Sequence, residues 1–116
     1  MVRVGDDIAG FTVDFDAATN TVHVKAWGYW NVQVALAFPG IVREACAKRL
    51  EPTLLMDMTE LKPMREEGQQ AFGALLESLS SLGVVRTTVT TSSHLTRLQL
   101  LRVSSDAGKR ELVLFT

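Results

Sequence analysis

The sequence has few of the residues that build redox and metal sites. It contains one cysteine, Cys46, and two histidines, His23 and His94, which are far apart along the chain. A single cysteine excludes an intrachain disulfide and any Cys-x-x-Cys motif, and neither histidine has a second ligand at metal-binding spacing. Cys46 is in step with the apolar residues of a predicted helix, which favours a buried thiol over a nucleophile. We therefore expect no metal and no cofactor.

The chain also lacks a strong charge of one sign and any long apolar run. Its formal net charge is -1, whereas nucleic acids and anionic membranes attract clustered Lys and Arg. No apolar run approaches the roughly 18 residues that span a bilayer, and residues 1–10 lack the apolar segment of a signal peptide. These absences predict a cytoplasmic protein that binds neither nucleic acid nor membrane.

Catalytic motifs are missing as well. No GxSxG surrounds any serine, and neither GxxxxGK[ST] nor GxGxxG is present to hold a phosphate. Asp57 and Glu60 could imitate a catalytic carboxylate pair, but an aspartate at the end of a strand beside a turn is more often structural. We expect that the protein is not an enzyme.

The first half of the sequence predicts a hairpin followed by a helix. Apolar and polar residues alternate over residues 11–16 and again over 22–26, the pattern of two antiparallel strands with one buried face. Asn31 is suited to cap a helix that carries Val34, Phe38, Val42 and Cys46 on one side. Because proline disrupts a helix interior, this helix is either kinked at Pro39 or begins there.

The second half predicts alternating strands and helices. Residues 53–58 form a short apolar run bounded by helix breakers, typical of a central strand. An amphipathic helix follows, ending at Gly83 as its C-cap; its apolar stripe consists of Phe72, Leu75, Leu76, Leu79 and Leu82.

The remaining elements are a strand, a helix and a final strand. Residues 84–91 are rich in β-branched side chains and predict a strand. Ser92 or Ser93 then caps a helix whose expected apolar face carries Leu95, Leu98 and Leu101, with Arg102 at its border. This helix is expected to end before a turn over residues 104–109, and residues 111–115 predict the last strand.

The region around Asp57 resembles the phosphoacceptor region of STAS domains, the family of anti-sigma-factor antagonists and sulfate-transporter regulatory tails. In that family a strand ending in Leu-Asp is followed by a short turn and an Asp-Ser-Ser-Gly motif that opens a helix. Here the strand reaches Asp57, and the helix opens with Arg65-Glu66-Glu67-Gly68. Gly68 matches the motif's glycine, Glu66 and Glu67 stand at the serine positions, and Gly28 after the second strand also fits the family.

The resemblance implies a STAS-like α/β fold, one domain over residues 1–116. We expect a mixed sheet of about five strands flanked by three helices, in the order β-β-α-β-α-β-α-β. The implied function is a non-enzymatic regulatory or protein-interaction module that resembles anti-sigma-factor antagonists and binds a protein partner. Because Glu66 and Glu67 replace the serines, we expect no serine phospho-switch and a fixed negative charge instead.

A contact surface is expected at one edge of the sheet. Right-handed crossovers make the strands that end near Trp27 and Asp57 parallel, so the loops that follow them lie together. Exposed aromatic side chains mixed with charges are typical of protein interfaces. The candidate contact residues are Tyr29, Trp30, Thr59, Lys62, Met64, Arg65, Glu66 and Glu67.

Two alternatives remain for this edge. Trp27 and Trp30 could fold inward as core residues, since large aromatic side chains are usually mostly buried. The same loops could instead line an apolar pocket for a small ligand at the carboxyl ends of the strands.

The sequence also predicts a symmetric homodimer. The final helix of the family has no counterpart after Phe115, and an uncovered strand edge or apolar patch is commonly managed by pairing. The competing hypothesis is that residues 1–10 fold over the gap and keep the chain monomeric.

Overall fold

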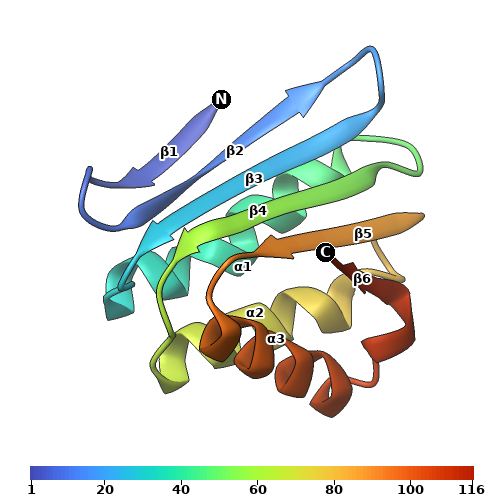
Figure 1. Cartoon of the computed structure of the whole chain (residues 1–116). Coiled ribbons are helices and arrows are strands. Elements are labelled where there is room, and N and C mark those ends of the chain that lie inside the picture. Colours follow the sequence, from blue (N-terminus) through green and yellow to red (C-terminus); the bar gives the residue numbers. More distant parts are fainter.

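One six-stranded sheet carries three helices on one of its faces (Figure 1). The structure is a computed structural model that describes all residues from 1 to 116. Along the chain its elements are β1 (Val2–Gly5), β2 (Gly10–Asp16), β3 (Thr21–Gly28), α1 (Val32–Ala47), β4 (Thr53–Leu61), α2 (Glu66–Ser78), β5 (Arg86–Thr91), α3 (His94–Asp106), a 3-10 turn (Arg110–Leu112) and β6 (Val113–Phe115).

The strands lie side by side in the order in which they occur in the sequence. The pairs β1–β2 and β2–β3 are antiparallel, and β3–β4, β4–β5 and β5–β6 are parallel. Each parallel connection passes through a helix and steps in the same direction along the sheet. Since such crossovers are right-handed, all three helices lie on the same face. The predicted α/β class is confirmed.

The sheet has one strand more than expected, because residues 2–5 pair with β2. Val2 lies opposite Val13, and Val4 lies opposite Phe11. This strand has only four residues, mostly exposed, so it lacks the alternation of buried and exposed positions that marks a strand in sequence. It forms the edge of the sheet opposite β6. The hypothesis that residues 1–10 cover a gap beside the last strand is therefore wrong.

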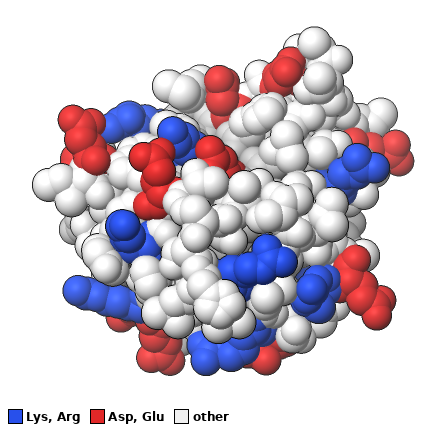
Figure 2. Space-filling view, viewed as in Figure 1, with Lys and Arg blue, Asp and Glu red and all other residues white.

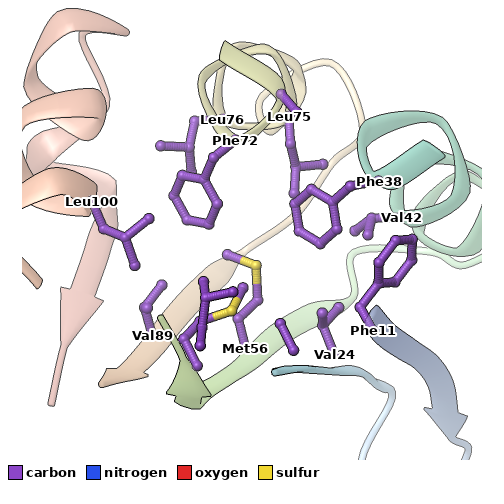
Figure 3. Packing of buried hydrophobic residues seen from close by; sticks show 14 of the residues in the cluster. Phe11, Val24, Phe38, Val42, Met56, Phe72, Leu75, Leu76, Val89 and Leu100 are labelled. Atoms are coloured by element: carbon purple, nitrogen blue, oxygen red, sulfur yellow. The ribbon is translucent and has the colours of Figure 1, made fainter. Parts of the chain in front are cut away.

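The core lies between the helices and the sheet. Its centre is a group of aromatic rings: Phe38 packs edge-on against Phe11 with ring centroids 5.2 Å apart and stacks with Phe72 at 6.3 Å. Figure 3 shows Phe38 and Phe72 pointing from the helices toward the sheet, where Phe11, Val24, Met56 and Val89 lie. Cys46 is fully buried on α1, as predicted, and burial raises the pKa of its thiol to about 11.

The structure decides between the alternatives for α1 and corrects the predicted end of α2. Helix α1 runs continuously through Pro39, so the alternative that it begins there is wrong. Its cap is confirmed, because Val34 N donates to Asn31 Oδ1 at 2.9 Å. Helix α2 ends at Ser78, and the Leu79 N–H turns back to the Leu76 carbonyl in a tighter bond. Gly83 therefore is not its C-cap, although its left-handed φ of 72° suits the turn that follows.

The first or last residues of the parallel strands β4, β5 and β6 differ from the predicted ones. Strand β4 continues to Leu61, so Asp57 lies within it and not at its end. Strand β5 begins at Arg86 instead of residue 84, and β6 begins at Val113 because the residues before it form a 3-10 turn.

Helix α3 begins as predicted but faces a different way. Ser93 caps it, accepting from Thr96 N at 3.2 Å. The helix continues to Asp106, past the predicted turn, and Leu95 and Leu98 are exposed. The buried positions are Thr96, Leu100, Val103 and Ser104. The predicted apolar face is therefore wrong.

The face of the sheet away from the helices is polar. Side chains such as Asp14, His23 and Lys25 stand on it, between the buried residues of the same strands. Figure 2 shows acidic and basic side chains interspersed on the face of the molecule that it presents. None of the three helices is both long enough and apolar enough to cross a membrane.

Candidate functional site

The carboxyl ends of β3, β4 and β5 meet at one edge of the sheet, as predicted for the loops after β3 and β4. Lys62 N donates to the Gly28 carbonyl at 3.1 Å, which ties these two loops together. The Ser92 hydroxyl donates to the Thr59 carbonyl and adds the loop after β5. We call this region the loop edge; it comprises residues 6–9, 28–32, 59–67 and 92–93.

Gly28 has a specific role at the loop edge. Its φ is +75°, and a Cβ placed on it would lie 2.0 Å from the Ile8 carbonyl oxygen. Only glycine fits such a conformation so close to another backbone segment. The turn between β1 and β2 is thereby brought against the end of β3, so Ile8 joins the loop edge.

Met64 anchors the loop between β4 and α2 instead of facing a partner. Its side chain is 4% exposed, and its backbone is held by Gln99 on α3: Met64 N donates to Gln99 Oε1 at 2.7 Å, and Gln99 Nε2 donates to the Met64 carbonyl at 3.1 Å. A Cβ on Gly68 would lie 3.0 Å from the Met64 Cβ. The glycine shared with the family motif therefore has a packing explanation, and the predicted contact role of Met64 is wrong.

Trp30 is also a core residue. It is 4% exposed, its ring lies 4.9 Å from that of Phe38 between centroids, and its indole N–H donates to the Gly10 carbonyl at 3.0 Å. The predicted contact role of Trp30 is wrong, and the alternative that it folds inward is confirmed. A ring buried in this way cannot line an open ligand pocket.

Trp27 does not follow Trp30 into the core. It is only half-buried, the Arg3 guanidinium carbon lies 4.9 Å from its ring centroid, and its indole N–H donates to the Asp6 carbonyl at 2.8 Å. For Trp27 the inward alternative is wrong. The indole instead fixes the turn between β1 and β2 against β3.

The other predicted contact residues remain accessible. Tyr29 is 67% exposed, and Lys62 and Arg65 are exposed in the loop before α2. Glu66 and Glu67 are exposed in the first turn of α2, where the unpaired backbone N–H groups favour negative charge. Their contact role stays a prediction.

Three exposed apolar residues of the loop edge and α1 were not predicted from the sequence as contact candidates. Ile8 is 83% exposed, Leu36 is 71% exposed, and Val32 lies one helical turn before Leu36. Residues four apart lie on the same side of a helix, so Val32 and Leu36 share an exposed side of α1, which begins three residues after Tyr29. Val32 and Leu36 could have been found, because they are out of phase with the buried stripe of α1. Nothing in the sequence around Ile8 signals its placement.

Asp57 and Thr59 form a local pair on the open face of β4. Thr59 donates to Asp57 Oδ1 from its backbone N at 3.0 Å and from its hydroxyl at 2.6 Å. Partial burial raises the pKa of Asp57, but these hydrogen bonds and the positive charge of Lys25 outweigh it, so the pKa lies below its ordinary value.

Asp57 and Glu60 have separate partners. Glu60 pairs with Lys25 at 2.9 Å, which raises the pKa of that lysine. The two carboxylates therefore do not form a catalytic pair, and no three His, Cys, Asp or Glu side chains cluster anywhere in the chain in a way that could hold a metal ion.

The strand order, the three helices on one face and the loop edge define a STAS-like fold. No protein-family model matches the sequence, and no curated protein matches it. The fold is similar to two solved anti-sigma factor antagonists. One is SpoIIAA in its unphosphorylated form, with a TM-score of 0.66 and 15% sequence identity over 91% of this chain and 87% of that chain. The other comes from Mycobacterium paratuberculosis, with a TM-score of 0.61 and 17% identity over 90% of this chain and 84% of that chain.

Proposed function

We propose that the chain is a STAS-like regulatory domain that acts by binding another protein, in the manner of anti-sigma-factor antagonists, and performs no catalysis. The observation that carries the proposal is a fold similar to two such antagonists, with exposed apolar side chains at the loop edge and in the first two turns of α1. These side chains are Ile8, Tyr29, Val32 and Leu36, and we call them together the apolar ridge.

The surroundings of the apolar ridge support its role as a protein interface. Interfaces combine exposed aromatic and aliphatic anchors with a charged rim. Here Lys62 and Arg65 supply positive charge, and Glu66 and Glu67 supply negative charge at the start of α2. The loops are held in place by backbone hydrogen bonds and by Gln99, so little ordering is needed on binding.

Titration calorimetry tests the proposal, with purified anti-sigma factors from the same organism as candidate partners. Tyr29→Ala and Leu36→Ala should each weaken binding by roughly tenfold, as expected for apolar anchors. Leu50→Ala is the matched control, because Leu50 is even more exposed than Tyr29 and Leu36 but lies before β4, at the opposite end of the sheet. Equal losses in all three variants, or no binding to any anti-sigma factor, would contradict the proposal.

Regulation by a serine kinase should be absent. Glu66 and Glu67 have no hydroxyl to phosphorylate, and the Thr59 hydroxyl, the nearest alternative, is already bonded to Asp57. Incubation with the kinase of a related regulatory system, followed by mass spectrometry, should find no phosphate in residues 59–68. The Glu67→Ser and Glu66→Ser variants are the matched positive controls. Stoichiometric phosphate on Thr59 of the unaltered chain would contradict this expectation.

We also propose a homodimer. Leu95 and Leu98 leave apolar side chains exposed on α3, and exposed apolar patches favour association. Light scattering over a dilution series should show a mass of twice 12.8 kDa at high concentration. A constant mass of 12.8 kDa at every concentration would exclude the dimer.

A further inference from the structure

The β6 edge has backbone groups without a strand partner. Thr116 N donates to the Val89 carbonyl at 2.9 Å, and the Thr116 carbonyl accepts from Thr91 N at 3.4 Å, so both polar groups of Thr116 face β5. Backbone groups alternate in direction along a strand. The N–H and C=O groups of Val113 and Phe115 therefore point away from β5, and β6 is the last strand of the sheet. Such an edge is a template for one more strand.

Two arginines converge beside this edge. The guanidinium carbon of Arg97 lies 5.7 Å from the centroid of the Phe115 ring, and that of Arg110 lies 5.5 Å from it. Arg97 also donates to the Thr116 carbonyl at 3.5 Å. Neither arginine forms an ion pair, since the three ion pairs of the structure join Arg3 to Asp7, Lys25 to Glu60 and Lys48 to Glu44. No Asp or Glu side chain therefore pairs with the two positive charges around this ring.

From these two observations we infer that the β6 edge binds an extended acidic peptide segment of a partner protein as a seventh strand. An open edge supplies main-chain hydrogen bonds to a peptide, and side-chain contacts on alternate residues supply specificity. Arg97 and Arg110 lie at Phe115, which packs against the core on the helix-covered side, whereas Leu114 is exposed. The incoming strand should therefore carry Asp or Glu on the side of the arginines and apolar residues on the side of Leu114.

The positive charge at the β6 edge opposes binding of a second copy of this chain there. A symmetric pairing of two β6 edges would bring Arg97 and Arg110 of both copies together, and like charges at close range oppose association. Nucleic acid would complement the positive charge of the two arginines, but it could not form the main-chain hydrogen bonds that a strand edge offers. This site is separate from the apolar ridge and does not depend on the proposed function.

The probe is a capped peptide of about six residues in which Glu alternates with Val, a length that suits addition to one strand edge. Nuclear magnetic resonance titration should show shifts at residues 113–116, and no comparable binding of a peptide in which Lys replaces Glu. The Arg97→Gln and Arg110→Gln variants should each bind the Glu peptide roughly tenfold more weakly. N-methylation of one of the two alternate sets of peptide nitrogens should abolish binding, because only one set faces β6 and donates to it.

Arg49→Gln is the matched control, because Arg49 also lies over a phenylalanine ring, that of Phe15, at 3.7 Å, but far from the β6 edge. Thermal melts of all variants establish that they are folded, and a Tyr29→Ala variant that still binds the peptide separates this site from the apolar ridge. Three results would overturn the inference: equal binding of the Glu and Lys peptides, binding that survives N-methylation of either alternate set of nitrogens, or a weakening in Arg49→Gln as large as in Arg97→Gln. Concentration-dependent protection of residues 113–116 without peptide would also overturn it, since a second copy would then hold the edge.

Discussion

Helices α2 and α3 have the same length of 13 residues but differ in how far their leucines are buried. Helix α2 packs against both α1 and α3 and buries Leu75, Leu76 and Leu79 completely or nearly so. Helix α3 lies at the end of the helical layer, next to a strand of only three residues (Figure 1). It leaves Leu95 and Leu98 in solvent and buries Thr96 and Ser104 in their place.

The polar residues under α3 are buried because each has a hydrogen-bond partner. The Thr96 hydroxyl donates to the Leu61 carbonyl at 3.2 Å and connects α3 to the end of β4. The Ser104 hydroxyl donates to the Leu100 carbonyl at 2.7 Å within the helix. A buried hydroxyl is tolerated when it is bonded. The position of α3's hydrogen-bond partner at the end of β4 thus decides which side of the helix is buried, more than the apolar character of each side does.

The largest expected effect concerns α2. Leu75→Ala should lower the free energy of unfolding by about 2 to 5 kcal/mol, because Leu75 is fully buried and its truncation leaves a cavity. Glu77→Ala, two residues further along and exposed, should change it by less than about 0.5 kcal/mol. Urea unfolding of both variants measures the difference. The reverse ranking would show that the face of α2 is assigned wrongly.

A somewhat smaller effect should separate two leucines of α3. Leu100→Ala should cost about 2 to 3 kcal/mol, since Leu100 is fully buried but lies near the edge of the sheet, where neighbours can relax. Leu98→Ala removes a side chain that is about half exposed and should cost less than about 1 kcal/mol. The comparison by urea unfolding decides between the two faces. A larger loss for Leu98→Ala would restore the face that the leucine pattern predicts.

The sequence predicted the buried side of α2 correctly, because its apolar residues occupy one arc and its other side is charged. The same reasoning failed for α3, because leucines at positions 95, 98, 100 and 101 surround that helix, and no periodicity selects a side. The buried residues 96, 100, 103 and 104 are spaced i, i+4, i+7 and i+8, a regular stripe, but two of them are polar. The burial of these two polar residues follows from hydrogen-bond partners at the end of β4 and within α3, which a one-dimensional pattern does not contain.

At the loop edge the sequence placed the loops correctly but not all of their side chains. Parallel strand direction was enough to bring Tyr29 near Lys62 and the start of α2. Whether an aromatic or a methionine in such a loop faces inward depends on the packing around it. Trp30 fits between Phe11 and Phe38, and Met64 fits over Gly68. Strand β1 was missed because it is short and exposed, and Ile8 was missed with it.

An effect of about 1 kcal/mol is expected from the hydroxyl that selects the buried side of α3. Thr96→Val keeps the volume of the side chain but leaves the Leu61 carbonyl without this donor. Thr88→Val on the open face of the sheet is the control, because the Thr88 hydroxyl makes no hydrogen bond within the chain, and it should be close to neutral. Urea unfolding measures both. If Thr96→Val were as stable as the unaltered chain, the bond to Leu61 would not explain the orientation of α3.

The smallest expected effect concerns the open face of the sheet, which no helix covers. The folded-state pKa of Asp57 lies below its ordinary value, because the bonds from Thr59 and the charge of Lys25 outweigh its partial burial. A depressed pKa contributes stability above the pKa of the unfolded chain, about 3.9, and that contribution is lost as the pH falls through the folded value. Asp57→Asn should therefore be less stable than the unaltered chain at pH 7, and the difference should shrink below about pH 4.

Urea unfolding of both proteins between pH 7 and pH 3 measures this difference, and Thr59→Val provides the matched background, because it removes the hydroxyl that donates to Asp57. In that background the pH dependence of the Asp57→Asn effect should be smaller. A difference that grows on acidification would mean that the carboxylate is destabilised in the folded chain. The hydrogen bonds between Thr59 and the Asp57 carboxylate would then not stabilise the open face of the sheet.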